Sequence, residues 1–546
     1  MTLLQKLSRN FRAFGGDKRA NVLITFALAT LPLVGFTGFA VDYSHANSVK
    51  AAMQAAVDST ALMLSKEATT DTASQLQTNA TKYFNALFTR PEATNVSLTA
   101  TYSATGGSQI VVNGSANVPT QFLGVIGYNN IPVTASSTAK WGSSRLRVAL
   151  VLDNTGSMAD SGKITALITA TKSLLTQLQN AATNNGDVYV SIIPFVKDVN
   201  VGSSNYSANW IDWTTWQSEP AILKNNYPSG WDQVNGGDPC PFSTYTYGFG
   251  CKSGPSQSAS NTNTIPSSGS YAGYVCPSMD SGAVNPLLNS VWYNGCYNSV
   301  AATRTISSGS NASCGGNTNC SCSGSGSSKS CKQTYYNHTW ISNATSTWTG
   351  CVMDRGDSTG PNSGNYDTNV VAPTTSTTAT LYPAEQYDPC PQAAMGLSYN
   401  WSGMTTLVNN MSPSGGTNQN IGLQLGWMSL AGGGPFTVPA MDPNYTYTQI
   451  IILLTDGLNT EDRWYGNGST TSTQVDARQT LTCANIKAAN ITIYTIQVNT
   501  DGSPTSTLLQ NCASDSTKFF LLTSSSAIVT TFNTIGTNLT KLRVAK

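Results

Sequence analysis

The sequence has little charge and almost no histidine. Charged residues make up 10% of its 546 residues, and 28 basic side chains nearly balance 27 acidic ones, so the net charge is only +1. A chain with so small a net charge has no field to attract a polyanion, and we expect no nucleic-acid partner. Only two histidines occur, His45 and His338. Most histidine-dependent acid–base and metal chemistry is therefore excluded, and we expect a protein that is not an enzyme.

Twelve cysteines form an even set, of which ten lie between Cys240 and Cys390. They lack the repeated Cys-x2-Cys pairs of a zinc site, so disulfides explain them better. Disulfides form in oxidising compartments, which places this region outside the cytoplasm. Their pairing cannot be read from the spacing. The remaining two, Cys483 and Cys512, flank a predicted strand, and we expect a disulfide that ties two helices rather than a reactive redox pair.

A charge-free run of 22 residues at positions 20–41 is long enough to cross a bilayer. Five basic residues come before it, and Asp42 follows it directly. This charge asymmetry predicts that residues 1–19 stay in the cytoplasm and that the rest is exported. We therefore predict an inner-membrane protein with an N-terminal transmembrane helix, whose bulk is periplasmic or surface-facing. The alternative is a cleaved signal peptide, because the small residues around Ala40 suit a signal peptidase.

The anchor is predicted to continue as a helix beyond the membrane. No glycine or proline interrupts the next stretch, in which Val49, Met53 and Val57 recur at helical spacing. We predict one helix of about 45 residues, within a helical stalk over residues 42–92. Its apolar stripe is either a packing seam with another helix or a core face. Residues 93–142 contain short alternating runs separated by turns, which predict a small α+β module.

Three N-terminal segments, Phe14–Asn21, Gly38–Tyr43 and Met53–Leu62, resemble those of TadG-like proteins of bacterial tight-adherence (Flp) pilus systems. The resemblance implies a membrane-anchored protein of pilus assembly. The span is also similar to the helix of type IV pilins, which is cut after a glycine and carries a glutamate shortly after the cut. Asn21 stands at that position after Gly16, and the span contains no glutamate. We therefore expect an anchor that is not processed.

The pattern then changes to that of an α/β domain. Residues 147–153 form a nearly continuous apolar strand, which suits a parallel sheet with both faces covered. A helix over 163–182 and a second apolar strand over 188–195 complete the first βαβ unit of a doubly wound sheet. The same alternation of strands and helices resumes after the insertion described next. We predict residues 143–199 and 403–546 as two parts of one α/β domain.

Residues 200–402 interrupt this domain. They hold ten of the twelve cysteines and eight of the eleven tryptophans, with many Gly, Ser and Asn residues and almost no helical periodicity. A structureless loop of that length is uncommon in a compact domain. We predict a separate inserted lobe that is stapled by disulfides and has the tryptophans as its core rather than as binding anchors.

Three pieces of sequence near predicted strand ends carry oxygen-bearing side chains. Asp153, Thr155 and Ser157 follow the first strand, Thr417 opens a helix and Asp456 follows a later strand. Their order and spacing resemble the metal-ion-dependent adhesion site (MIDAS) of von Willebrand factor type A domains. The resemblance implies that all five side chains bind one divalent cation, most simply Mg2+, with Mn2+ or Ca2+ as alternatives; hard cations prefer such oxygen ligands. The alternative is a vestigial loop that only caps a helix.

The same resemblance implies an open coordination position that accepts an acidic residue of a protein partner. We therefore predict an exported, membrane-anchored adhesion and assembly protein of a tight-adherence pilus. One alternative is a secreted or surface metal-dependent adhesin not tied to pili. Another is an enzyme or a metal-chelatase partner, but export, disulfides and the lack of a P-loop motif or a nucleophile–histidine pair argue against it.

We predict that protease added to spheroplasts degrades residues 42–546 and leaves only the anchor, because the basic flank keeps the N-terminus inside. Immunoblotting of a tag at each end of the chain checks this. Full protection of the C-terminal tag in intact spheroplasts, with digestion after lysis, would contradict the topology.

Overall fold

The computed structural model describes residues 20–68, 70–104, 108–141, 144–242, 250–256, 258–278, 293–357, 364–385 and 390–544. The chain forms two compact units. The anchor unit comprises residues 1–144 with 442–446 and 543–546, and the sheet unit comprises residues 145–441 with 447–542. The expected cytoplasmic segment, residues 1–19, lies outside the described residues.

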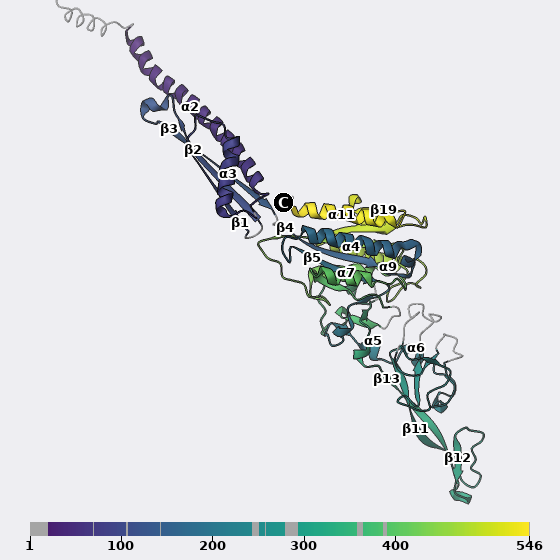
Figure 1. Ribbon diagram of the computed structural model, residues 1–546. Helices are drawn as coiled ribbons and strands as arrows, with labels where there is room; N and C mark the ends of the chain where they lie inside the picture. The colour runs from purple at the N-terminus through teal and green to yellow at the C-terminus, as the bar shows by residue number, and fades with distance from the viewer. Residues whose placement is uncertain are drawn as a thin grey trace, which may run out of the picture. The chain divides into compact units, whose positions relative to one another are not determined.

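The anchor unit consists of a long helix, a shorter helix and a three-stranded antiparallel sheet (Figure 1). Its elements are α2 (Ala20–Leu64), α3 (Ala73–Leu87), β1 (Thr94–Ser103), β2 (Ser108–Pro119) and β3 (Asn130–Trp141). Helix α2 has 45 residues, which agrees with the length expected from its periodicity. A capping box starts α3: the Thr72 hydroxyl accepts the N–H of Gln75, and the Gln75 side chain accepts the N–H of Thr72.

The apolar stripe of α2 is a core face. Val49, Met53 and Val57 are fully buried in a cluster that also contains residues of α3, β2 and β3. Gly114 of β2 lets the helix approach closely, because a Cβ atom there would lie 3.2 Å from Val57 Cγ1. The helical stalk and the α+β module, which we expected as separate parts, therefore share one hydrophobic core.

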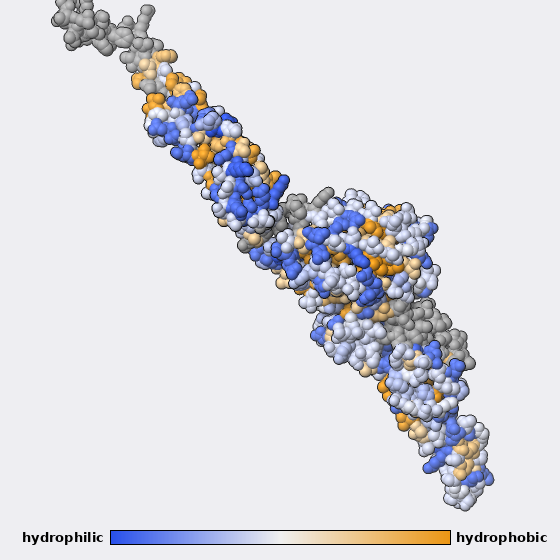
Figure 2. Space-filling model, viewed as in Figure 1, coloured by the Kyte–Doolittle hydropathy of each residue, from blue (hydrophilic) through white to orange (hydrophobic). Residues whose placement is uncertain are grey.

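The first half of α2 carries exposed apolar side chains, which are visible as orange surface along the helix in Figure 2. They include Phe26, Leu28, Leu33, Val34 and Phe36. Among the residues that the structure describes, α2 is the one helix long and apolar enough to cross a membrane. Its length and composition thus agree with the expected transmembrane helix.

The sheet unit is built on a six-stranded sheet with the order β16-β5-β4-β17-β18-β19. Its strands are β4 (Ser144–Asp153), β5 (Val188–Phe195), β16 (Met395–Ser398), β17 (Thr446–Thr455), β18 (Thr492–Val498) and β19 (Phe519–Leu522). The pairs β4–β5, β17–β18 and β18–β19 are parallel, whereas β16 is an antiparallel edge strand. The sequence pattern does not reveal β16, so this second part of the α/β fold begins near residue 395 rather than 403.

Helices cover both faces of this sheet. One face packs against α4 (Lys163–Ala181), α7 (Trp401–Asn409) and α11 (Ser526–Val544), and the other against α8 (Gln419–Ala431), α9 (Thr473–Ala488) and α10 (Thr507–Cys512). Leu150 of β4 lies in the first layer and Val151 in the second. Because both of its faces are buried, β4 has a continuous apolar sequence instead of an alternating one.

The insertion is divided into a base and a distal lobe. The base contains the sheet β6-β14-β15-β7 and a short helix: β6 (Val199–Asn200), β7 (Ile211–Asp212), α5 (Thr214–Gln217), β14 (Cys351–Val352) and β15 (Tyr382–Glu385). Trp216, Trp348 and Tyr382 belong to the same buried cluster as Val151 and Ile193 of the main sheet. The base is therefore part of the α/β core, which corrects the expectation that residues 200–402 form one separate lobe.

The distal lobe has a core of its own. It contains α6 (Ala221–Lys224) and the sheet β12-β13-β11-β10-β8-β9, made of β8 (Cys251–Lys252), β9 (Asn261–Thr262), β10 (Tyr274–Pro277), β11 (Gly295–Ser308), β12 (Cys320–Ser323) and β13 (Ser330–Ser342). Tyr297 lies 5.0 Å from Trp231 and 5.1 Å from Trp340, measured between ring centroids. Disulfides Cys240–Cys251, Cys276–Cys296, Cys314–Cys320 and Cys322–Cys331 staple this lobe, and Cys351–Cys390 staples the base.

Helix α8 lies so close to the sheet that only glycine fits at the contact. A Cβ atom at Gly422 would lie 2.8 Å from Phe195 Cδ1 and 2.9 Å from Val151 Cγ1. We predict that Gly422→Ala lowers the free energy of unfolding by about 1–3 kcal/mol, although alanine favours a helix by about 1 kcal/mol. Chemical denaturation of the detergent-solubilised full-length protein checks this, with Thr169→Ala on the exposed side of α4 as the control. A Gly422→Ala protein as stable as the control would contradict the close packing.

Candidate metal centre

Asp153 ends β4 and is fully buried. Its Oδ1 accepts hydrogen bonds from the Thr155 main-chain N–H at 2.8 Å and from the Thr155 hydroxyl at 2.6 Å. Its Oδ2 accepts a hydrogen bond of 2.7 Å from the hydroxyl of Thr455, the last residue of β17. Groups from the ends of two neighbouring strands therefore hold this carboxylate in one orientation.

Asp456 follows β17 and faces the loop after β4. The Ser157 hydroxyl donates to Asp456 Oδ1 at 2.7 Å, and Ser157 Oγ lies 3.3 Å from Thr155 Oγ1. Lys163 Nζ, at the start of α4, lies 2.5 Å from Asp456 Oδ2 and donates to the Ser157 carbonyl at 3.2 Å. Four of the five expected ligands thus form a continuous hydrogen-bonded chain that runs from Asp153 to Asp456.

Thr417 lies just before α8 and is tied to the loop after β17. Its N–H donates to the Thr460 hydroxyl at 2.8 Å, and its carbonyl accepts the Thr460 N–H at 2.9 Å. A Cβ atom on Gly457 would lie 3.9 Å from Ser157 Oγ and 4.0 Å from Thr417 Oγ1. The hydroxyls of Ser157 and Thr417 therefore flank Gly457, and the structure brings all five expected side chains to one edge of the sheet.

Main-chain contacts join the loop after β4 to the loop before α8. The Gly156 N–H donates to the Gly415 carbonyl at 3.0 Å, and the Ser414 N–H donates to the Asn154 carbonyl at 2.9 Å. The Asn154 side-chain amide adds a bond of 2.7 Å to the Ser412 carbonyl. The side chains of the candidate centre are thus held by a cross-linked set of loops rather than by a mobile one.

The centre has more buried negative than positive charge. Burial raises the pKa of Asp153 to about 7, and the nearby carboxylate of Asp456 adds to this increase, while hydrogen bonds from Thr155 and Thr455 oppose it. Among the described residues, Lys163 is the one cation in hydrogen-bond contact with these two carboxylates. Burying two carboxylates costs free energy that positive charge must offset. A proton on Asp153 or an additional cation would supply the positive charge that Lys163 alone does not.

Two residues that matter to this geometry, Lys163 and Thr455, are absent from the set expected from the sequence. The only sequence signal for Lys163 is its place in the first turn of a helix, where the helix dipole disfavours a lysine; its partner Asp456 is given by the structure. Thr455 has none, since threonines are common in strands and its hydroxyl gains a role only when β17 lies next to β4.

The donor set fits a hard divalent cation. Asp153 and Asp456 supply carboxylate oxygens, and Thr155, Ser157 and Thr417 supply neutral hydroxyl oxygens. Mg2+ and Ca2+ prefer such oxygen ligands, whereas softer metals prefer thiolate or imidazole. The glycine after Asp456 has no side chain to fill the space between the two hydroxyls that flank it.

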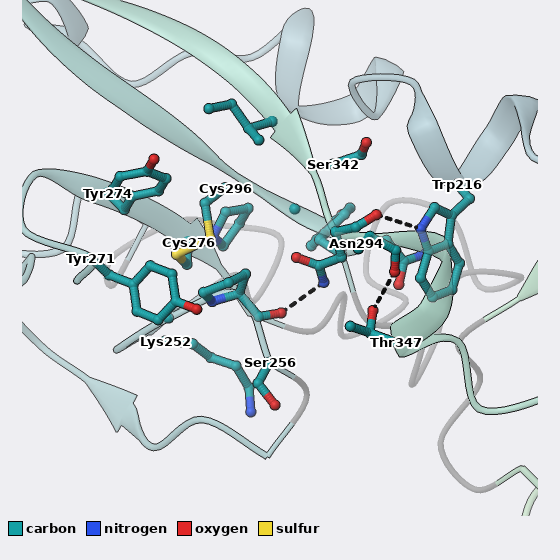
Figure 3. A pocket seen from close by; sticks show the side chains of 18 of the residues that line it. Trp216, Lys252, Ser256, Tyr271, Tyr274, Cys276, Asn294, Cys296, Ser342 and Thr347 are labelled. Carbon is teal, nitrogen blue, oxygen red and sulfur yellow. Dashed lines mark hydrogen bonds between the residues drawn. A yellow bond between two sulfur atoms is a disulfide. The ribbon is translucent and has the colours of Figure 1, made fainter. Parts of the chain in front are cut away.

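A cleft lies in the insertion and is less suited to a cation (Figure 3). This cleft has a volume of about 800 Å³, and no acidic side chain is among its described lining residues. Its polar groups largely bond to each other. The Trp216 indole N–H donates to the Asn343 carbonyl at 3.0 Å, and the Asn343 amide donates to the Pro255 carbonyl at 2.8 Å. We therefore place the candidate centre at the sheet edge.

The cysteines contribute disulfides rather than ligands. The structure joins Cys483 of α9 to Cys512 of α10, and both residues are buried in the core layer on that face of the sheet. The sulfurs of Cys314, Cys320 and Cys322 lie within 4.8 Å of one another, but each of them is part of a disulfide. Disulfide sulfur lacks the thiolate charge that binds a metal.

Comparison with known proteins identifies a family at the N-terminus. Residues 20–63 match the model of the family described as putative Flp pilus-assembly TadE/G-like. The matched residues comprise most of α2, from the membrane-span candidate to the part that packs in the anchor unit. This confirms the TadE/G-like relationship of that segment. No curated protein matches the chain.

Several solved structures share weak similarity with the chain. They include the pilus adhesin SpaC from Lactobacillus rhamnosus GG, at 12% identity and a TM-score of 0.28, covering 83% of this chain and 35% of SpaC. The type V pilus tip protein Mfa5 from Porphyromonas gingivalis has 7% identity and a TM-score of 0.29, covering 82% of this chain and 56% of that one. Proximal thread matrix protein 1 from the mussel byssus has 10% identity and a TM-score of 0.27, covering 74% and 47%. The chain thus spans about a third of the length of SpaC, and TM-scores this low assign no fold to it.

We predict that Asp153 makes the metal-free protein less stable as the pH rises from about 4 to about 7. The pKa of this carboxyl is raised from 3.8 to about 7 by folding, so the stability linked to it is present below 3.8 and is lost as the pH rises through 7. The expected slope is at most about 1.4 kcal/mol per pH unit. Urea denaturation of metal-free protein at pH 5 and pH 7 should show a smaller loss for Asp153→Asn than for the wild type. The exposed control Asp515→Asn should lose as much stability between pH 5 and pH 7 as the wild type does. Equal losses of stability in all three proteins would contradict the assignment.

Proposed function

We propose that this chain is a membrane-anchored, exported adhesion and assembly protein of a tight-adherence (Flp) pilus. The TadE/G-like match over residues 20–63 supports the anchor and the relationship to pili. The single observation that carries the proposed binding role is the convergence of oxygen ligands at the sheet edge. Ser157 and Asp456 are 299 residues apart in the sequence, yet they share a hydrogen bond of 2.7 Å.

We propose further that the sheet unit without its insertion is a domain of the von Willebrand factor type A kind. Three features support this assignment: a mostly parallel sheet, helices on both of its faces, and ligands on loops at the carboxyl ends of β4 and β17. Open α/β sheets bind their ligands at that edge, because the loops that follow neighbouring parallel strands meet there.

In this proposal a divalent cation, most simply Mg2+, provides a positive centre that attracts an acidic side chain of a protein partner. The two carboxylates, Asp153 and Asp456, balance the charge of the ion. Neutral oxygen ligands come from the hydroxyls of Thr155, Ser157 and Thr417. Lys163 positions Asp456 through the carboxylate oxygen that Ser157 does not contact. Each of these groups binds or orients, so the proposed role is recognition and not an enzymatic reaction.

The proposed location is the inner membrane, with the N-terminus in the cytoplasm and the sheet unit in the periplasm or at the cell surface. The disulfides of the insertion support an oxidising compartment for that unit. A secreted metal-dependent adhesin not tied to pili is the second candidate. The match of residues 20–63 to a pilus-assembly family favours the first one.

We predict that Asp153→Asn weakens Mg2+ binding by the full-length protein at least about tenfold, or about 1.4 kcal/mol. This variant removes one of two carboxylate charges but keeps the side-chain shape and the ion pair between Lys163 and Asp456. Calorimetric titration of Mg2+ and Mn2+ into the detergent-solubilised protein measures the effect, with Asp515→Asn as the control. A pilus-assembly or adhesion assay in cells should show the same order of the variants, because ion and partner binding are linked. Equal ion affinity in all three proteins, or normal assembly by an ion-free variant, would refute the proposal.

A further inference from the structure

The turn between β2 and β3 exposes a group of apolar side chains. We call residues 120–130 the apolar turn; it contains a short 3-10 helix, Leu123–Ile126. Its largest exposed side chains are Phe122 (46% exposed), Val125 (87%), Ile126 (68%) and Tyr128 (68%). No charged residue occurs anywhere from Ala93 to Ala139. An exposed apolar patch of this kind marks an interaction surface.

The apolar turn lies against the end of the expected transmembrane span (Figure 1). Phe122 lines a small groove together with Leu33, Val34 and Val41 of α2. A Cβ atom on Gly38 would lie only 2.5 Å from Phe122 Cβ, so the helix and the turn are in close contact. At 1.5 Å per helical residue, the groove follows the last ~12 Å of the span.

The main chain of the apolar turn is bonded within the anchor unit. Asp42, the first charged residue after the span, is buried, and its carboxylate accepts the N–H groups of Gln121, Phe122 and Leu123 at 2.8–3.0 Å. The Tyr128 N–H donates to the Leu123 carbonyl at 3.0 Å. A segment can enter an apolar medium only when its main-chain polar groups have such partners, because unbonded ones cost several kcal/mol in lipid.

Aromatic residues surround this place on the helix as well. Phe39 and Tyr43 stack with ring centroids 5.8 Å apart, and both side chains are exposed. Phe122 and Tyr128 of the apolar turn are exposed aromatic side chains as well. Tyrosine is enriched where hydrocarbon meets water in a membrane, because its ring is apolar and its hydroxyl is polar.

We propose that the apolar turn inserts into the membrane boundary beside the anchor, with lipid as its partner. The proposal rests on the proposed role of residues 20–41 as a transmembrane anchor. Lipid is the occupant because the exposed side chains of the turn continue the exposed apolar surface of α2, and Asp42, the charged residue between them, is buried. The anchor unit then touches the membrane at two places, the helix and the turn, which restrains its tilt relative to the membrane surface.

The test uses a fluorescent bimane label on single cysteine variants of the full-length protein in vesicles of bacterial phospholipid that contain brominated lipid. The native cysteines are all in disulfides, so the label reacts with the introduced residue. Val125→Cys reports on the apolar turn, and Leu28→Cys reports on the span. Thr138→Cys is the matched control: it is an exposed position of β3, about 26 Å along the strand from the turn at 3.3 Å per residue.

We expect brominated lipid to quench the label at Val125 at least half as strongly as at Leu28, and to leave the label at Thr138 unquenched. Quenching at Leu28 without quenching at Val125 would overturn the inference and leave the proposed anchor intact. Quenching at neither position would overturn the anchor, and the inference with it. Equal quenching at Val125 and Thr138 would mean that the whole unit adsorbs to the membrane, which also contradicts a specific role of the turn.

Discussion

The burial of β4 and β17 on both faces is the constraint on which the sheet unit depends. Strands with continuous apolar runs are stable only between two layers of helices, and these two are neighbours in the middle of the sheet. Their carboxyl ends then emerge side by side. Asp153, Thr455 and Asp456 meet there even though about 300 residues separate the two strands. The candidate centre is thus a consequence of how the core is buried.

The same burial creates the charge imbalance of the centre. The side chains of Asp153 and Asp456 are buried because they lie at the ends of buried strands. Lys163 forms an ion pair with Asp456 only. Burial then favours the protonated form of Asp153, which explains why its pKa is raised to about 7. A proton and a metal ion are two ways to supply the missing positive charge. Carboxylates with hydroxyls but without thiolate or imidazole favour the hard ion.

The insertion is held to the α/β domain by side-chain packing as well as by its covalent connections. Trp216 and Trp348 of its base enter the core layer that also holds α8 and the inner side of β4. The glycines of α8 make this layer thin, since a Cβ at Gly422 or Gly426 would collide with Val151. Changes in the base are therefore coupled to the sheet that carries the candidate centre, whereas the distal lobe keeps its own aromatic core and disulfides.

Helix α2 is one continuous helix whose two halves have different surroundings. Its second half presents a stripe to the core of the anchor unit, where Val49, Met53 and Val57 are buried. Among its described residues, the first half exposes large apolar side chains such as Phe26, Leu28 and Phe36, as expected of a helix in lipid. Asp42 lies between the halves and uses its carboxylate to hold the turn after β2. One acidic residue thus marks the end of the span and shapes the loop beside it.

Much of this organisation can be predicted from local patterns in the sequence. The length of α2 follows from periodicity, and the buried strands β4, β5, β17 and β18 follow from continuous apolar runs. These features depend on neighbouring residues, so a window of sequence contains their signal. The five candidate ligand positions come instead from a resemblance to a metal-ion-dependent adhesion site, and the structure brings these side chains to one edge of the sheet.

Other features were decided only by tertiary structure. The core shared by the base of the insertion and the main sheet, the edge strand β16, the pairing of the cysteines and the contact between Lys163 and Asp456 each join segments far apart in the chain. A local sequence pattern does not predict such contacts. They depend on how the apolar faces of helices and strands from distant parts of the chain pack against each other. The position of residues 120–130 against α2 is of the same kind, because only the packing of the sheet on the helix places them, exposed, beside the expected span.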